Sequence, residues 1–345
     1  MEKENLNRRT FISKTLAITT GAAIGLSLEE KILMAQTAGQ AEQNQQQKAD
    51  KNSMPSGRIG KVKISRLICG GNLITGWAHS RDLIYVSQLL KNYFTEEKII
   101  DTLRLCEQNG INTMVVHTDE KAMKVLNKYW KQHGGKIQWI AQVLPVDFRD
   151  MTLSEWKIKT AIDNGAVGAF VEGTTAERCL QRGRFDLIER MLNIIKQNGI
   201  IAGVGGHSLR VPIECEASDL DPDFYVKTMH RDDYWSATPK EFRKDMNVDT
   251  NEFFTNKDHN KDHDNIFCIN PEEVIDFMAK VKKPWIAYKV LAAGAIHPKV
   301  GFDYAFENGA DFVLAGMFDF QVAQDAQIAI NCVAKNQKRT RKWWA

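Results

Sequence analysis

The sequence alternates between short apolar runs and longer amphipathic stretches. Four of the amphipathic stretches end in the same pair of residues, Asn-Gly, beginning at Asn109, Asn164, Asn198 and Asn308. Glycine readily adopts the left-handed conformation that follows a helix, so each pair predicts a helix end. An apolar run follows each pair at once, which is typical of a strand buried on both faces.

Taken in order, the apolar runs predict eight strands. These are Lys63–Cys69, Ile111–His117, Ile137–Leu144, Ala166–Glu172, Ile200–His207, Phe224–His230, Trp285–Val290 and Asp311–Met317. Helical patterns lie between them, for example Thr95–Asn109, Arg184–Asn198 and Pro271–Val281. Eight such units predict an α/β fold, a single (β/α)8 TIM barrel. An open doubly wound sheet is the alternative, but no Gly-x-Gly-x-x-Gly motif follows the first strand to support it.

Two connections from a strand to the next helix are long, Asn72–Phe94 after the first strand and Arg231–Asn270 after the sixth. Loops after strands lie on the catalytic face of a barrel, and loops of this length form lids or binding walls. Their aromatic residues suit a sugar ring, or else anchor the lids. The side chains that we expect to bind substrate lie on these loops and at strand ends: Asn72, Trp77, His79, Arg81, Gln142, Tyr234 and Trp235.

The N-terminus has the features of an export signal. The segment from Asn7 to Lys14 contains Arg8-Arg9 and resembles the twin-arginine export motif, and the apolar run after it is too short for a good membrane span. We predict a signal segment over 1–34, a flexible Gln-rich linker over 35–55 and the barrel over 56–345. The resemblance implies a periplasmic protein that uses the twin-arginine export machinery, retained at the membrane if the signal is not cleaved.

Composition narrows the class of protein further. The chain has 345 residues, of which 43% are hydrophobic and 26% charged, with a formal net charge of +3, as expected for a soluble globular protein. No basic stripe alternates with aromatic residues, so we expect no nucleic-acid partner. The six cysteines form no C-x-x-C motif, and Cys215 and Cys268 fall in loops where they could pair in an oxidising compartment.

Polar residues close several of the buried strands, where barrels place their chemistry. Burying such groups is costly without partners, so their number at one rim indicates an organised site. Glu172, His207 and His230 end consecutive strands and could bind a divalent metal ion, with a metal-free hydrogen-bonded cluster as the alternative. Lys289 could act as a base or Schiff-base former, but we favour a fixed cation for an enolate or carboxylate. The predicted catalytic residues are Lys289, His117, Glu172 and Lys227.

Two segments resemble the start of the aldo/keto reductase fold. They are the glycine-ended strand from Leu67 to Asn72 and the entry to the second strand from Cys106 to Thr113. The resemblance implies a barrel, but that family's catalytic residues are replaced. A tyrosine acid should follow the second strand, where His117-Thr118-Asp119-Glu120 stands and only Asp119 fits the pattern. The family's lysine and histidine are replaced by Gln142 and Glu172.

These residues favour an exported lyase, hydratase or isomerase of carbohydrate metabolism that acts on a sugar or keto-sugar. A histidine or lysine would remove a proton next to a carbonyl, while a metal ion or a cation stabilises the enolate. The alternatives are a diverged, NADP-dependent relative of the aldo/keto reductases and a non-catalytic ligand-binding barrel. We expect no saturable binding of NADPH at physiological concentrations, because Glu172 would repel a dinucleotide phosphate and an exported enzyme has no ready supply of NADPH.

Overall fold

A computed structural model describes residues 53–77, 83–144, 151–218, 220–245 and 267–345. The chain divides into two units, Met1–Asn52 and Ser53–Ala345, and the described residues all belong to the second. The predicted signal segment and most of the predicted linker therefore lie outside the described residues. The description below concerns the second unit.

Eight parallel strands close into a barrel, which confirms the predicted (β/α)8 fold. Their order around the barrel is β10-β3-β4-β5-β6-β7-β8-β9, so each strand pairs with its neighbours in the sequence and the last pairs with the first. The strands are β3 (Leu67–Gly70), β4 (Thr113–His117), β5 (Gln138–Val143), β6 (Gly168–Val171), β7 (Ile201–Gly206), β8 (Phe224–Thr228), β9 (Trp285–Tyr288) and β10 (Phe312–Ala315).

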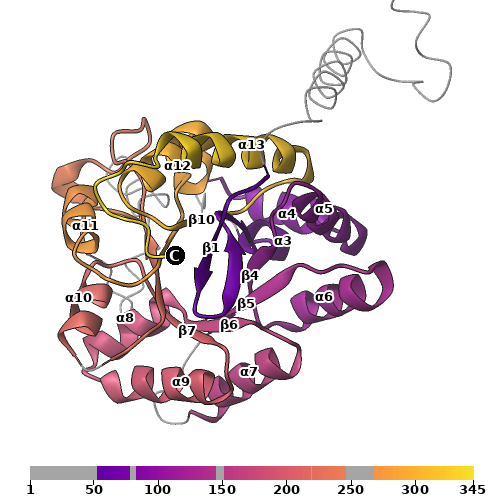
Figure 1. Cartoon of the computed structure of the whole chain (residues 1–345), viewed down its shortest axis with the longest axis horizontal. Helices are drawn as coiled ribbons and strands as arrows, with labels where there is room; N and C mark the ends of the chain where they lie inside the picture. The colour runs from indigo at the N-terminus through magenta and orange to yellow at the C-terminus, as the bar shows by residue number, and fades with distance from the viewer. Residues whose placement is uncertain (1–52, 78–82, 145–150, 219, 246–266) are drawn as a thin grey trace, which may run out of the picture. The chain divides into compact units, whose positions relative to one another are not determined.

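Helices form a ring around these strands (Figure 1). The α-helices are α3 (Asn72–Thr75), α4 (Val86–Tyr93), α5 (Glu96–Gln108), α6 (Glu120–His133), α7 (Thr152–Asp163), α8 (Gly173–Gln181), α9 (Phe185–Gln197), α10 (Arg210–Ala217), α11 (Pro271–Met278), α12 (Pro298–Glu307) and α13 (Asp319–Lys335). The predicted Asn-Gly stops are confirmed, because the glycine after each of α5, α7, α9 and α12 has a positive φ. Among the described residues, no helix is long and apolar enough to cross a membrane.

An antiparallel hairpin precedes the barrel. The prediction of one first strand over Lys63–Cys69 was wrong, because this range contains the end of the hairpin and the start of the first barrel strand. The hairpin strands are β1 (Ser56–Ile59) and β2 (Val62–Ser65), and the barrel begins only at β3. Figure 1 shows the hairpin across the middle of the ring. Its apolar side chains Ile59, Val62 and Ile64 belong to the same buried cluster as residues of the barrel interior. The hairpin therefore closes one end of the barrel.

The core forms two separate clusters of buried side chains, one inside the barrel and one between the barrel and the helices. Ile286 of β9 and Val226 of β8 belong to the inner cluster, whereas Ala287 and Tyr225, their neighbours along the chain, belong to the outer one. This alternation is that of a regular strand. The alternation decides which side chains at the carboxyl ends of the strands point into the barrel.

None of the six cysteines, all of which lie in the described part of the chain, forms a disulfide. Cys215 and Cys268 are both buried and free, so the suggested pairing of these two residues is not found in the structure. Each of the six acts as a small apolar side chain in the core.

Asp325 provides a stability prediction that does not involve the strand ends. It lies on α13, is 3% exposed, and its Oδ2 has no hydrogen-bond partner within the described residues. Burial raises the pKa of Asp325 to about 7. This folded pKa is above the unfolded value of about 4. The contribution of the protonated carboxyl to the free energy of unfolding is therefore fully present below pH 4 and is lost as the pH rises through 7.

We therefore expect Asp325→Asn to be more stable than wild type at pH 8 by about 1–3 kcal/mol, with the difference shrinking toward pH 4. Urea denaturation at several pH values measures this effect. Asp163→Asn, at an exposed position on α7, is the control and should leave stability nearly unchanged at every pH. A wild-type protein that is equally stable or more stable at pH 8 would contradict the prediction.

Candidate functional site

The candidate site lies at the carboxyl ends of the barrel strands, called the mouth below. Ile286, Val115 and Ile140 point into the barrel, so Tyr288, His117 and Gln142, two residues further along their strands, point the same way. Glu172 follows β6 and His207 follows β7. His117 and Gln142 are also direct partners across β4 and β5. The barrel thus brings polar side chains from five strands to one end.

Tyr288 is a central residue of this set, and the sequence analysis missed it. Its hydroxyl is buried and has no hydrogen-bond partner within the described residues. Its ring centroid lies 5.5 Å from that of His207. Burial, with Glu177 and Glu172 adding to it, raises the pKa of Tyr288 above its usual value, so the hydroxyl keeps its proton. The signal that could have found it is the alternation of β9, which directs Tyr288 inward.

Gly173, the first residue of α8, makes room for this pair. A Cβ atom at position 173 would lie 3.0 Å from the Tyr288 hydroxyl and 3.0 Å from two atoms of the His207 ring. Only glycine lets the backbone approach the two side chains this closely without a shift.

His207 is held from behind by a second residue that the sequence analysis missed, Glu177. The Glu177 Oε1 accepts hydrogen bonds from the backbone N–H groups of His207 at 2.6 Å and Ser208 at 2.7 Å, and its Oε2 lies 3.2 Å from the His207 Nδ1. Burial raises the pKa of Glu177 to about 8 and lowers that of His207 well below its usual value. A neutral, oriented imidazole therefore lies beside Tyr288. Glu177 lies inside α8, and nothing in the local sequence distinguishes it from an ordinary glutamate of a helix.

Lys289 follows Tyr288 in a strained turn. Its φ is +58°, and Ala292 and Ala293 are also left-handed, at +45° and +55°. Residues other than glycine rarely adopt this backbone conformation, and such backbone strain is concentrated at functional sites. The Lys289 ammonium lies 4.0 Å from the centroid of the Phe267 ring and 5.6 Å from that of Tyr288. The ammonium group of Lys289, the predicted cation, therefore lies near the ring of Tyr288.

His117 ends β4 on another wall of the mouth. Its Nδ1 is buried and has no hydrogen-bond partner in the part of the chain that the structure describes. Burial lowers the pKa of His117 to about 4; the negative charge of Asp119 opposes this shift, and the charges of Lys157 and Lys289 add to it. The ring centroid of Trp77 lies 6.4 Å away. Asp119, which fits the reductase pattern, caps α6 by accepting the Ala122 N–H at 2.7 Å.

The geometry does not support the predicted metal site of Glu172, His207 and His230. Glu172 caps α8, with Oε2 accepting the Thr175 N–H at 3.0 Å. Both ring nitrogens of His230 are engaged by the backbone: Nδ1 lies 2.7 Å from the Arg231 carbonyl, and Nε2 accepts the N–H groups of Phe267 and Cys268. Within the described ranges, no group of three or more His, Cys, Asp or Glu side chains could hold a metal ion.

Lys227, predicted to be catalytic, does not face the mouth. Its neighbours Val226 and Phe224 point into the barrel, so Lys227 points out of it. Its ammonium donates to the His207 carbonyl at 2.7 Å and to the carbonyl and hydroxyl oxygens of Thr228 at 3.1 and 2.7 Å. These acceptors match the three donors of an ammonium group. Lys227 therefore ties β7 to β8 in this structure.

The predicted substrate-binding residues are more widely spread. Asn72 begins α3 and Gln142 lies near the end of β5, both half-buried. Tyr234 packs edge-on against His230, and Trp235 is 90% exposed. Gln142 lies opposite His117 in the pairing of β4 with β5, and the ring of Trp77 lies 6.4 Å from that of His117. His79 and Arg81 lie outside the described residues.

Because His230 fastens the chain beyond the long loop after β8, its replacement should have a large effect. His230→Leu leaves the N–H groups of Phe267 and Cys268 buried without an acceptor, which we expect to cost about 2–4 kcal/mol of stability. Burial lowers the pKa of His230 to about 4. The unfolded value is about 6.5, so its contribution is complete above pH 6.5 and is lost as the pH falls toward 4.

The loss of stability in His230→Leu should therefore be larger at pH 7.5 than at pH 4.5, as measured by chemical denaturation. His133→Leu, at an exposed position on α6, is the matched control and should change stability little at either pH. Equal stability of His230→Leu and wild type at pH 7.5 would show that the hydrogen bonds from Phe267 and Cys268 to His230 do not stabilise the fold.

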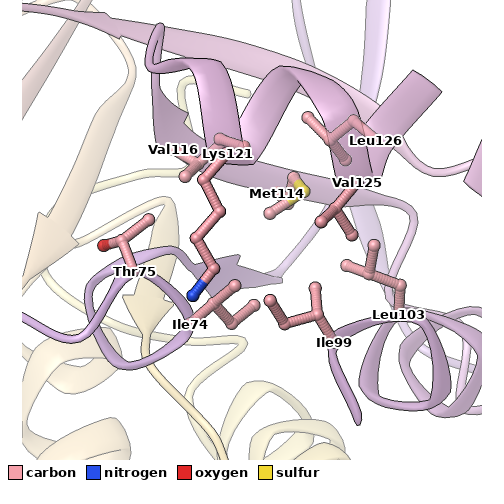
Figure 2. A pocket seen from close by; sticks show the side chains of 10 residues that line it. Ile74, Thr75, Ile99, Leu103, Met114, Val116, Lys121, Val125 and Leu126 are labelled. Atoms are coloured by element: carbon pink, nitrogen blue, oxygen red, sulfur yellow. The ribbon is translucent and has the colours of Figure 1, made fainter. Parts of the chain in front are cut away.

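An apolar crevice, shown in Figure 2, lies elsewhere on the molecule. It is lined by residues of α3, α5, α6 and β4, including Ile74, Ile99, Met114 and Leu126. Met114 belongs to the outer cluster of the core, so the crevice lies between the barrel wall and its helices rather than at the mouth. It contains no strand-end polar residue and is not the candidate site.

Comparison with known proteins shows the fold of the chain. No protein-family model and no curated protein matches the sequence. Among solved structures, a Pseudomonas aeruginosa protein provisionally assigned as an aldo-keto reductase matches 83% of this chain and 98% of its own, with 12% identity and a TM-score of 0.54. An aldo-keto reductase from Bacillus halodurans matches 82% of this chain and 96% of its own, with 11% identity and a TM-score of 0.51. The chain therefore has a TIM-barrel fold that distantly resembles these enzymes.

Proposed function

We propose that this barrel is an enzyme that moves a proton next to the carbonyl group of a small molecule, and that the reaction takes place at the mouth. The observation that carries the proposal is the buried Tyr288 hydroxyl, which has no hydrogen-bond partner among the described residues. Leaving such a donor unpaired is costly, so a ligand oxygen is expected to accept from it. The raised pKa of Tyr288 suits a donor that stays protonated through the reaction.

The neighbouring residues supply the other parts of this chemistry. The neutral imidazole of His207, oriented by Glu177, accepts the proton from carbon. Electron density then moves onto the carbonyl oxygen, where the Tyr288 hydroxyl stabilises it through a hydrogen bond and the Lys289 ammonium stabilises it through its charge. Returning the proton to a different carbon, or expelling a neighbouring hydroxyl group, would give an isomerase or a lyase. A sugar or keto-sugar remains the substrate class that we expect.

The fold comparison supports a second candidate, carbonyl reduction with NADPH. Solved aldo-keto reductases share the fold, and Tyr288 with Lys289 provides a tyrosine donor beside a cation. In that reaction the Tyr288 hydroxyl would give its proton to the oxygen that forms after hydride transfer. Our expectation that NADPH does not bind stays a prediction.

Two measurements separate the candidates. In D2O, proton transfer exchanges hydrogen for deuterium at the carbon next to the carbonyl, which NMR detects in pyruvate, hydroxyacetone, D-fructose or 2-keto-D-gluconate. Carbonyl reduction instead requires saturable NADPH binding, which fluorescence titration detects. Exchange without NADPH binding supports the first candidate. Stoichiometric binding of NADPH at micromolar concentrations, without exchange, replaces it with the second.

A further inference from the structure

Phe267 is a buried aromatic residue beside the groups that the proposed chemistry uses, and that chemistry gives it no role. It is 4% exposed. Its ring centroid lies 5.8 Å from that of His207, at an interplanar angle of 38°. The Lys289 ammonium nitrogen lies over the same ring, 4.0 Å from its centroid. One ring is therefore next to both the proposed base and the proposed cation.

The backbone of Phe267 is fixed to the end of β8. Its N–H donates to the Nε2 of His230 at 3.0 Å, and its carbonyl accepts from the Thr228 hydroxyl at 2.9 Å. Both partners are fully buried. Hydrogen bonds of this kind hold a supporting residue in one place, so that it can fix the position of the groups it touches.

The Lys289 ammonium is a group that needs such support, because a lysine head is a charge on a flexible four-carbon stem. It lies over two aromatic rings, 4.0 Å from the centroid of Phe267 and 5.6 Å from that of Tyr288. The electron-rich face of an aromatic ring attracts a cation within about 6 Å, and more strongly where water is excluded. The shorter distance makes the Phe267 ring the stronger of these two attractions.

The position of the ammonium also bears on the proposed base. Burial lowers the pKa of His207 well below its usual value, the charges of Lys289 and Lys227 add to this shift, and the charge of Glu172 opposes it. An ammonium kept in place by Phe267 therefore helps to keep the His207 imidazole neutral, which is the form that accepts a proton.

We propose that Phe267 is a positioning residue whose ring holds the Lys289 ammonium over its face and packs against the His207 imidazole. This inference rests on the proposed function, because these are the cation and the base of that reaction. It depends on the aromatic character of the residue. A leucine at position 267 would keep an apolar side chain in the space but would offer the ammonium no ring face.

Fluorination tests the electrons of the ring while nearly keeping its shape. 3,4,5-Trifluorophenylalanine at position 267 draws electron density from the ring face and weakens its attraction for the ammonium. Competitive acetylation of the ligand-free full chain, followed by mass spectrometry, measures how freely each lysine reacts. Relative to wild type, Lys289 should react about threefold faster in the fluorinated protein and about tenfold faster in Phe267→Leu. Lys159, whose side chain is 75% exposed, is the internal reference and should not change.

Deuterium exchange with the four carbonyl compounds named above measures the effect on the chemistry. Exchange should slow about tenfold in the fluorinated protein and about 10²-fold in Phe267→Leu, because both changes misplace a group that acts on the substrate. The same fluorinated residue at position 302 is the matched control. Phe302 is fully buried in the outer cluster of the core, and its replacement should change neither acetylation nor exchange.

The two measurements keep this inference separate from the proposed function. Faster acetylation of Lys289 in both variants, with no exchange in the wild-type protein, would support the positioning of the ammonium and contradict proton transfer. Wild-type exchange that is unchanged in both variants would support proton transfer and contradict the positioning role. Unchanged acetylation in both variants, or faster acetylation in Phe267→Leu alone, would reduce Phe267 to a packing residue and overturn the proposal.

Discussion

Asp311→Asn is expected to lower the free energy of unfolding by about 3–5 kcal/mol, because it removes the negative charge from a buried group of ion pairs. Asp311 is fully buried immediately before β10, at the end of the barrel opposite the mouth. Its two oxygens contact Arg339 at 3.1 Å and Arg341 at 2.8 Å, and these arginine side chains are 1% and 2% exposed. The Asp311 oxygens also accept the backbone N–H groups of Trp285 at 3.0 Å and Trp344 at 2.8 Å.

This cluster fastens the C-terminal tail to the barrel. Arg341 donates to the carbonyls of Met278, Gly309 and Lys283, and Arg66 donates to the carbonyl of Ala345 at 2.6 Å. Figure 1 shows the C-terminus next to the hairpin. Asparagine at position 311 would leave two guanidinium groups buried without a counter-charge. The tail would then be free to leave the barrel, and its packing would be lost as well.

Urea denaturation followed by far-ultraviolet circular dichroism measures the effect. Asp303→Asn is the control, because Asp303 pairs at the surface with Lys335, which is 63% exposed, and should cost less than about 1 kcal/mol. The double variant Asp311→Asn/Arg341→Met should be more stable than the sum of the two single losses predicts, since it removes one of the unpaired charges. A loss below about 1 kcal/mol in Asp311→Asn would show that the buried ion pairs do not hold the tail.

Tyr288→Phe should slow deuterium exchange into the substrate about 10²- to 10³-fold, the usual effect of removing a donor to a developing oxyanion. Stability should stay the same or rise slightly, because the hydroxyl removed is buried and unpaired among the described residues. This combination distinguishes a catalytic role from a structural one. The rate is measured by NMR in D2O and the stability by urea denaturation.

Tyr225→Phe is the matched control for Tyr288→Phe. Tyr225 lies on the neighbouring strand β8, points outward, and its hydroxyl donates to Glu216 at 2.7 Å. Its replacement should cost about 1 kcal/mol of stability and leave the exchange rate unchanged. If Tyr288→Phe exchanged at the wild-type rate, Tyr288 would have no part in the chemistry.

The sequence by itself determined the barrel. Each parallel strand is covered on both faces and must be apolar along its length, so eight strands leave eight short apolar runs. The helix ends are equally local, because a glycine such as Gly110 or Gly199 provides the left-handed residue that ends its own helix. The hairpin was missed for a related reason. Its inward residues Val62 and Ile64 are as apolar as those of β3, so the local pattern merged them into one strand.

The site depended on information that is not local. Along β8 and β9, a shift of one residue exchanges the inner and outer faces of the barrel, and this placed Lys227 outside and Tyr288 inside. The partners of a buried polar group come from distant parts of the chain. Glu177 meets His207 from α8, and His230 uses its ring to hold the backbone at Phe267. The arginines of the C-terminal tail resemble a solvated charged end in the sequence. Only the closed barrel, by placing Asp311 between them, makes them part of the core.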